Sequence, residues 1–539
     1  MIPRTLTRSR RGPRALITAT ALLAVGALTA CSAGGPGGEA EEVTDSGKAL
    51  EQVTVALPGS LANLYVGQES GVLNYYLAST VQEGLVGLDA DGTLVPALAE
   101  TWDTPDANTY VFTLRSDAVF HNGDPVTPED VVFSLLQAKD ATASPGLTWY
   151  LSNMKSVEKT GEHQVTVVTA EPDPAFIKNM TTAGATFVTQ EKHWQEVDGA
   201  VGTADSLLLG SGPYAVTDFT PGESVTLERS DDWWGTPGKV ESIRVEFIPD
   251  ENTRLLAAQS GDIDIAFNVP LKQAQQWQES AGLRVDSVND LSYVGLLFDQ
   301  NVAPFDDLKV REAIAHSVDR EAIVEKLLRG YGEAASTIMT PESITDQLDA
   351  EAARKLLASV PQLDFDLDAA KQALSESSVP EGFTAELAYP NTGPHLGTAA
   401  QSLAENLKQV GITLSVKEQP IETWLAGIGT GENGLGLMWY FSTTGDPAEV
   451  SSYLLAADNV NHVESEEMLG FFREANTAQT PEERLDLLMQ AETLNAEQVI
   501  NAPLWWGQSL TAFSDRVGIA EFSPYTFLGP WGAELFAAE

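Results

Sequence analysis

The sequence predicts an α/β protein of two lobes that are joined by two crossing segments. The chain has 539 residues, which is more than one hydrophobic core supports, since single cores stop growing near ~250–300 residues. Strand-like and helix-like patterns alternate through both halves, roughly 51–266 and 267–500, as expected for two α/β lobes. The segment 501–539 is too short for a domain, so we expect it to return and complete the first lobe. Two crossings of this kind form a hinge.

The first lobe is expected to begin with a strand. Residues 51–59 alternate apolar and polar side chains and then break at a Pro-Gly pair, which predicts a strand that ends in a turn. The same alternation over 109–115 predicts another strand. Residues 128–138 open with Pro-Glu-Asp and continue with apolar residues at helical spacing, which predicts a helix with a capped start.

The pattern changes in the middle of the chain. Residues 243–248 are typical of a strand, 251–260 of a helix that Gly261 stops, and 262–267 of a short strand. Two helical units are then expected within 306–330, each beginning at an aspartate that can cap it.

The second lobe is expected to hold a parallel sheet covered by helices, because its patterns follow one another as β-α-β-α-β. These segments are, in order, 383–390, 397–410, 412–418, 420–428 and 435–441. A long helix is expected over 481–500 and a strand over 503–506, before an aromatic tail over 522–536 closes the chain.

The N-terminus has the layout of a secretion signal. Five arginines precede an apolar run, 15–30, that ends in Leu-Thr-Ala directly before Cys31. The run is short for a membrane span, which needs about 20 residues. A cysteine at this place resembles a bacterial lipoprotein box, which implies that the signal peptide 1–30 is cleaved and that Cys31 carries lipid; a buried leftover thiol is the alternative. The Gly, Ser and acidic residues within 31–50 then predict a flexible tether.

This layout predicts an extracytoplasmic protein that is anchored to the cell membrane by the lipid on Cys31. The export route, Sec or Tat, stays open, because Arg10-Arg11 is only a partial twin-arginine match. Cys31 is the single cysteine of the chain, so no disulfide can form within it.

The charge of the chain excludes some partners. The formal net charge is −46, and losing residues 1–30, with five arginines and no acid, gives −46 − 5 = −51. So acidic a chain repels nucleic acid and anionic lipid headgroups, and no nucleic-acid partner is expected. We interpret the acidic residues as a solvated surface.

Motifs for a cofactor, a metal ion or catalysis do not stand out. Residues 429–434 match G-x-G-x-x-G, but a helix precedes them and a strand follows, the reverse of a dinucleotide loop, so a helix-to-strand turn is expected. The six histidines lack metal-ligand spacing, and His395, which follows the strand 383–390, is interpreted as a surface or loop histidine. With no G-x-S-x-G elbow and no Walker loop, we expect no cofactor and no bound metal.

Four stretches carry a resemblance to a known family: 83–135, 210–235, 251–266 and 305–332. The first contains Pro-Ala-Leu-Ala-Glu-x-Trp, then Phe-x-Leu-Arg, then Phe-His-x-Gly-x-Pro-x-Thr-x-Glu-Asp-Val. The four follow the family's order and span most of the chain after the leader. Together they resemble the family 5 extracellular solute-binding proteins, the dipeptide, oligopeptide and nickel receptors of ATP-driven (ABC) importers.

The resemblance implies a two-lobed periplasmic-binding-protein-like fold of the large class, with an extra subdomain at about 83–205 inserted in the first lobe. It implies a monomer that captures a small solute, with a peptide as the leading ligand, and delivers it to ABC permease and ATPase subunits. A metal chelate or a sugar is the alternative ligand. A secreted hydrolase using Asp262 and Asp264, or a sensor lipoprotein, is the alternative function.

Candidate ligand-binding residues lie at strand ends and at the crossings, because ligands of open α/β sheets sit beyond the carboxyl ends of strands. Clefts for small ligands also combine aromatic walls with a few polar groups. The candidates are Ser60, Asn268, Asn391, Trp439, Phe441, Thr443, Asp446 and Trp505. Trp439 and Phe441 could instead face the core, since side chains of a strand alternate between its faces.

One departure from the family bears on the ligand. Peptide receptors of this family hold the peptide's α-ammonium with an aspartate in a pattern like Ala-Asp-Tyr-x-x-Pro. Aligning Pro447 with that proline puts Thr443 at the aspartate position. Threonine has no charge to pair with a buried ammonium, and Asp446 could substitute only if the loop shifts. A blocked peptide, a sugar or a metal chelate therefore becomes more plausible than a peptide with a free amine.

Overall fold

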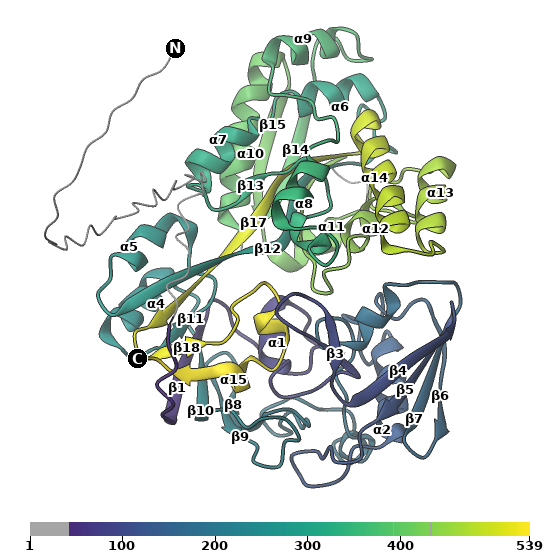
Figure 1. The fold of residues 1–539 in the computed structure, drawn as a ribbon. Helices are drawn as coiled ribbons and strands as arrows, with labels where there is room; N and C mark the ends of the chain where they lie inside the picture. Colours follow the sequence, from purple (N-terminus) through teal and green to yellow (C-terminus); the bar gives the residue numbers. More distant parts are fainter. Residues whose placement is uncertain (1–42, 392, 431–433) are drawn as a thin grey trace, which may run out of the picture. The chain divides into compact units, whose positions relative to one another are not determined.

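The computed structural model describes residues 43–391, 393–430 and 434–539, so the predicted signal peptide, Cys31 and part of the 429–434 turn lie outside the described residues. The described chain is a mixed α/β protein (Figure 1). Within these ranges, no helix combines the length and the apolar character needed to cross a membrane.

The largest sheet of the described chain has nine strands (Figure 1). Eight of them follow the order β16-β12-β17-β11-β1-β10-β9-β8, and the ninth, β13, pairs with β17. Its strands are β1 (Leu50–Leu57), β8 (Tyr214–Thr220), β9 (Ser224–Arg229), β10 (Val240–Phe247), β11 (Ile265–Ala266), β12 (Leu283–Phe298), β13 (Glu333–Ala334), β16 (Leu435–Phe441) and β17 (Asn501–Ser514).

Four hydrophobic clusters divide the described chain into two lobes. Two clusters hold residues from 53–285 and from 510–535, together with Tyr331, and we call this part the N-terminal lobe. The other two hold residues from 293–506, and we call this part the C-terminal lobe. Residues 267–285 still pack with the N-terminal lobe, so the chain leaves that lobe later than the boundary between 266 and 267 that the sequence predicts.

The two lobes are connected by β12 and β17, which pair antiparallel along their length (Figure 1). The pairing runs from Leu283↔Ser514 in the N-terminal lobe to Leu297↔Asn501 in the C-terminal lobe. It is interrupted between Asn289 and Tyr293, where the register shifts. The sequence did not predict β12, because residues 290–298 are almost all buried and such strands show no alternation of apolar and polar residues.

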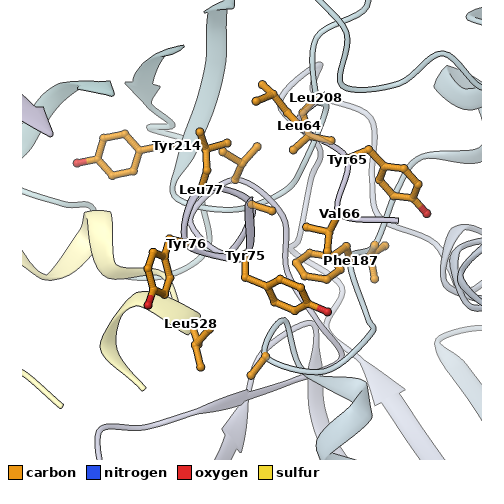
Figure 2. Packing of buried hydrophobic residues seen from close by; sticks show 14 of the residues in the cluster. Leu64, Tyr65, Val66, Tyr75, Tyr76, Leu77, Phe187, Leu208, Tyr214 and Leu528 are labelled. Atoms are coloured by element: carbon orange, nitrogen blue, oxygen red, sulfur yellow. The ribbon is translucent and has the colours of Figure 1, made fainter. Parts of the chain in front are cut away.

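The helix α1 (Val72–Ala78) is central to the N-terminal lobe. Figure 2 shows Tyr75, Tyr76 and Leu77 of α1 pointing into a cluster of buried side chains. Tyr75 packs edge-on against Phe187, with 5.5 Å between ring centroids. Tyr76 packs against Phe267 and Phe527, so that the C-terminal segment is part of this core.

A second sheet completes this lobe, in the order β4-β5-β7-β6. The remaining elements of the lobe are β2 (Val86–Leu88), β3 (Leu94–Pro96), β4 (Ala99–Asp106), β5 (Thr109–Leu114), α2 (Pro128–Lys139), β6 (Met154–Gly161), β7 (Gln164–Thr169), η1 (Phe176–Met180), α3 (Glu191–Glu196), α4 (Glu251–Ser260), η2 (Leu271–Gln273), α5 (Ala274–Gln278), β18 (Val517–Ile519), η5 (Thr526–Leu528), α15 (Trp531–Glu534) and β19 (Leu535–Ala537).

The C-terminal lobe is mostly helical around β12, β16 and β17. Its other elements are α6 (Leu308–Ala315), α7 (Arg320–Ala322), the π-helix η3 (Ile323–Leu327), η4 (Pro341–Ile344), α8 (Ala350–Leu357), α9 (Leu367–Ser375), β14 (Thr384–Pro390), α10 (Pro394–Val410), β15 (Thr413–Gln419), α11 (Ile421–Gly427), α12 (Glu449–Leu455), α13 (Glu466–Ala475) and α14 (Pro481–Gln498).

The predicted β-α-β-α-β run is present, but its three strands do not form one parallel sheet. β14 and β15 pair in parallel as a separate two-stranded sheet. β16 instead pairs antiparallel with β12, from Ser292↔Phe441 to Phe298↔Leu435. The reason is that β12 supplies a long buried edge that the prediction lacked. The strand predicted over 262–267 is also shorter, since β11 covers two residues.

A buried carboxylate holds two parts of the N-terminal lobe together. Glu83 accepts hydrogen bonds from Ser211 Oγ (2.8 Å), Trp233 Nε1 (3.2 Å) and Trp234 Nε1 (2.8 Å). Arg115 lies 3.3 Å over the ring of Trp234. Burial raises the pKa of Glu83 to about 7, although these donors oppose the rise. The folded state therefore binds a proton more tightly here than the unfolded chain does.

Glu83 makes the stability of the fold depend on pH. Its pKa is about 7 when folded against a model value of 4.5, so stability should be highest below that window and fall as pH rises through it, by roughly 3 kcal/mol in full. We expect the melting temperature of the wild type to fall between about pH 5 and about pH 8, and Glu83→Gln to remove the part of that fall that comes from Glu83. Glu51→Gln, at an exposed site, is the control. An unchanged pH profile in Glu83→Gln would contradict the assignment.

Candidate functional site

The loop that follows β16 lies where the two lobes meet. We call residues 442–446 the β16 loop. The hydroxyl of Tyr150, from the N-terminal lobe, lies 3.2 Å from Thr443 Oγ1. The ammonium of Lys178 donates to the carbonyl of Gly445 at 3.3 Å. Phe441, at the end of β16, packs against the main cluster of the N-terminal lobe. Residues from both lobes therefore face one another around this loop.

Glu449 fixes the shape of the β16 loop from within the C-terminal lobe. Its carboxylate accepts from Ser442 Oγ at 2.6 Å, from Thr444 N at 3.2 Å and from the Thr444 hydroxyl. Tyr440 donates to its other oxygen at 3.3 Å. Burial raises the pKa of Glu449, and the donors oppose the rise. A carboxylate with this many donors holds the loop in one conformation.

Asp446, which the sequence proposed as a ligand-binding carboxylate, is occupied by a residue of its own lobe. Arg484 of α14 donates to both carboxylate oxygens, at 2.7 and 3.0 Å. The Asp446 side chain is 6% exposed and that of Arg484 13%. Burial alone would raise the pKa of Asp446, but the charge and hydrogen bonds of Arg484 outweigh it and hold the pKa below its usual value. Both oxygens of Asp446 thus accept from Arg484, and Oδ1 also accepts from Ala448 N at 2.8 Å, so the charge of Asp446 is balanced within its own lobe.

His395, Trp439 and Trp505 form an aromatic group in the C-terminal lobe, where Trp505 belongs to a hydrophobic cluster and Trp439 packs against it. The ring centroid of His395 is 5.2 Å from that of Trp439 and 6.2 Å from that of Trp505. Both tryptophans pair with Val294 of β12, one from β16 and one from β17. Residues directly opposite across neighbouring strands project from the same face, which brings the two indoles together. Burial lowers the pKa of His395 to about 4, so its imidazole is neutral near pH 7.

The remaining candidates lie at other strand ends. Ser60 is exposed after β1. Asn391 is exposed at the end of β14, where its backbone N–H donates to Gln419. Asn268 is half-buried and has a positive φ of 51° beside Phe267. The candidates on β16, in its loop and on β17 thus lie on neighbouring elements. Ser60, Asn268 and Asn391 lie on separate segments.

Several residues at the junction of the lobes escaped the sequence analysis. His395 was interpreted as a loop histidine, but it begins α10 and packs against two tryptophans. Tyr150, Lys178 and Arg484 come from segments without a recognisable motif. An arginine on the same helix face as buried leucines was the one available signal for Arg484, because a buried arginine needs an acidic partner.

The carboxylates of the hydrolase alternative have structural contacts. Asp264 accepts from Thr54 N at 2.9 Å and from Arg516 Nη2 at 2.7 Å, which ties β1 to the C-terminal segment. Asp262 accepts from Ser260 Oγ at 2.6 Å at the end of α4. Among the described residues, no group of three or more His, Cys, Asp or Glu side chains is arranged to hold a metal ion.

Two α/β lobes thus share one sheet and meet around the β16 loop. The profile of the bacterial extracellular solute-binding proteins, family 5, matches residues 93–462. That range covers more than half of the chain, and the chain belongs to this family.

Two curated relatives show the range of this similarity. The heme-binding protein A of Haemophilus influenzae is 23% identical over 470 residues, covering 82% of this chain and 84% of the relative. The dipeptide-binding protein of Pseudomonas aeruginosa is 24% identical over 477 residues, covering 83% and 88%.

A solved structure supports the fold. The periplasmic binding protein DppA from Helicobacter pylori, in complex with the peptide STSA, has a TM-score of 0.78 at 18% identity and covers 91% of this chain and 99% of its own. The predicted two-lobed periplasmic-binding-protein-like fold is thereby confirmed.

The Asp446–Arg484 pair should be essential for the stability of the C-terminal lobe. We expect Arg484→Met to lower the free energy of unfolding by about 3 kcal/mol, because it leaves a buried carboxylate without its partner. Adding Asp446→Asn should recover part of that loss. Urea unfolding of the three proteins measures both effects.

The matched control is Arg473→Met, which removes an exposed arginine whose contact with Glu466 is 3.5 Å long. Its effect should stay within about 0.5 kcal/mol. An equally small effect of Arg484→Met would show that Asp446 does not depend on this partner.

Proposed function

We propose that this protein is the substrate-binding lipoprotein of an ABC importer. It captures a small solute between its two lobes and delivers it to a membrane permease, whose ATPase subunits supply the energy. The observation that carries the proposal is that a chain of family 5 presents polar and aromatic side chains of both lobes around the β16 loop. Capture involves no covalent step.

The proposed mechanism is closure of the lobes around β12 and β17. A solute that contacts both lobes binds the closed arrangement better than the open one, and so shifts the population toward it. The aromatic group and the hydroxyls of Tyr150 and Thr443 are the contacts we propose for the solute. Ser60, Asn268, Asn391, Phe441 and Asp446 stay candidates from the sequence.

A peptide is the leading ligand, on the names of relatives that bind dipeptides and peptides. Two observations favour a peptide without a free amine. Thr443 occupies the position expected for the ammonium-binding aspartate, and both oxygens of Asp446 are engaged by Arg484. A sugar or a metal chelate is the alternative, and a heme-binding relative shows that peptides are not the sole ligands of such proteins.

We further propose the organisation expected from the sequence. Residues 1–30 are a signal peptide, 31–50 a tether that begins at the lipidated Cys31, and 501–539 a return segment that completes the first lobe. The subdomain at about 83–205 belongs to that lobe. The mature protein would be an extracytoplasmic monomer held at the cell membrane, where a tether raises its effective concentration near the permease.

The lipid anchor can be tested in bacterial cells. Labelled palmitate should be incorporated into the wild-type chain and be absent from Cys31→Ser, which should appear in the soluble fraction outside the cytoplasm. Label retained in Cys31→Ser would contradict the proposed lipid site.

Solute capture can be tested with paired probes. We expect isothermal titration with a library of di- and tripeptides, and with N-acetylated versions of the same peptides, to give binding that is at least about tenfold tighter for the acetylated members. The physical reason is that a buried ammonium without a carboxylate partner is strongly disfavoured. Mass spectrometry of solutes that copurify with the protein, and titration with neutral sugars and nickel–histidine, cover the alternative ligands. Failure of every class to bind would overturn the proposal.

A further inference from the structure

Three separate segments of the N-terminal lobe converge on the β16 loop. Tyr150 precedes β6 and contacts Thr443, and Lys178 of η1 donates to the carbonyl of Gly445. Tyr525, just before η5, packs against Gly445 so closely that a Cβ on this glycine would overlap the tyrosine hydroxyl. All three contacts fall within three consecutive residues of the C-terminal lobe.

Tyr525 is itself held from the opposite side. A Cβ on Gly92, in the turn between β2 and β3, would lie 2.6 Å from Cζ of the same tyrosine. The Tyr525 ring is buried. It lies between the backbones of Gly92 in the N-terminal lobe and Gly445 in the C-terminal lobe. Gly92 and Gly445 have φ angles of +78° and +63°, which side chains other than glycine rarely adopt. Both the backbone conformation and the close approach require glycine here.

A charged cluster surrounds the same loop. Asp173 of the N-terminal lobe is near enough to the opposite lobe that the charges of Asp446 and Arg484 both act on its pKa. The charge of Lys178 lowers the pKa of Asp446. The two carboxylates would repel each other when the lobes approach, and the two cations compensate them. Arg484 compensates Asp446 within its own lobe, but its action on Asp173 and that of Lys178 on Asp446 exist only while the lobes are in contact.

The loop is rigid on its own side, so contacts to it act on the whole C-terminal lobe. Glu449 fixes its start, and Arg484 fixes its end. A segment that was free to move could follow the N-terminal lobe as the lobes separate. Because the β16 loop is fixed, it would lose the contacts of Tyr150, Lys178 and Tyr525 together when the lobes separate.

We propose that the β16 loop is a latch: the N-terminal lobe fastens on it through Tyr150, Lys178 and Tyr525, and these contacts stabilise the closed arrangement without any solute. The latch lowers the free energy that a solute must supply to close the protein. Apparent affinity then rises with the fraction of protein that is already closed. This inference goes beyond the proposed function, because it concerns the solute-free protein and stands whichever solute class is captured.

The experiment measures closure in the absence of solute. Spin labels are placed at two exposed residues, one per lobe, in the protein carrying Cys31→Ser, Lys155→Cys and Glu467→Cys. Unfolding in guanidinium and refolding removes solutes that copurify. Electron–electron distance measurements should show a short-distance, closed population. Adding Tyr150→Phe and Lys178→Met should lower the ratio of closed to open protein about tenfold, since two hydrogen bonds across the lobes are lost.

A matched control removes the same chemical groups within one lobe. Tyr65→Phe loses a hydroxyl that is hydrogen-bonded to Ser144 Oγ, and Lys192→Met loses an ammonium that pairs with Asp124; all four residues belong to the N-terminal lobe. The protein that carries both control substitutions should keep the distance distribution of the parent protein. If the latch variant gives the same distribution as the control, or if the solute-free protein has no closed population, the inference is overturned.

A second variant acts by a different route. Gly445→Ala should open the protein, because a Cβ there meets the Tyr525 hydroxyl. Gly470→Ala, on α13 with open space around its Cα, is the matched control and should not. Melting temperature and circular dichroism separate opening from loss of fold: the inference requires Gly445→Ala to shift the distances while its spectrum stays that of the folded protein. An unshifted distribution would overturn it.

Discussion

The pairing of β12 with β17 is the constraint on which the two-lobed structure depends. These strands carry one hydrogen-bonded ladder from the core of one lobe into the core of the other. At the register shift, Asp290 accepts from Ser292 N at 2.9 Å and from Ser509 Oγ at 2.5 Å, which replaces ladder bonds by side-chain bonds. Gly507 lies against Ser292 with no room for a Cβ. A ladder resists bending where it is continuous, so the proposed closure would bend the ladder at this interruption.

The sequence predicted the parts of the fold that depend on neighbouring residues. The helix predicted to begin at Pro128 is capped, by a capping box between Thr127 and Asp130, and Gly261 and Gly411 end their helices in the left-handed conformation. β12 was missed because a strand buried on both faces carries no alternating pattern. Without β12, the pairing of β16 could not be predicted, since partner choice depends on which edge lies nearby in three dimensions.

The candidate site, like the fold, could be predicted only where it depends on local sequence. Strand-end reasoning selected Trp439 and Trp505, but their proximity depends on a shared partner, Val294 of β12. Asp446 was selected for its charge, yet its role is decided by an arginine 38 residues further along the chain. Charge, size and position on a strand can be inferred from sequence. Whether a carboxylate is free or already paired depends on tertiary contacts.

The composition explains why the junction of the lobes contains cations. The chain has 77 Asp and Glu against 31 Lys and Arg, so two lobes that approach each other carry charge of the same sign and repel. Across the junction, Asp446 raises and Arg484 lowers the pKa of Asp173, and Lys178 lowers the pKa of Asp446. Because these charges are shielded from solvent, their interactions are stronger than those of surface pairs. Two of the cations of the chain, Lys178 and Arg484, lie where the lobes meet and offset part of this repulsion.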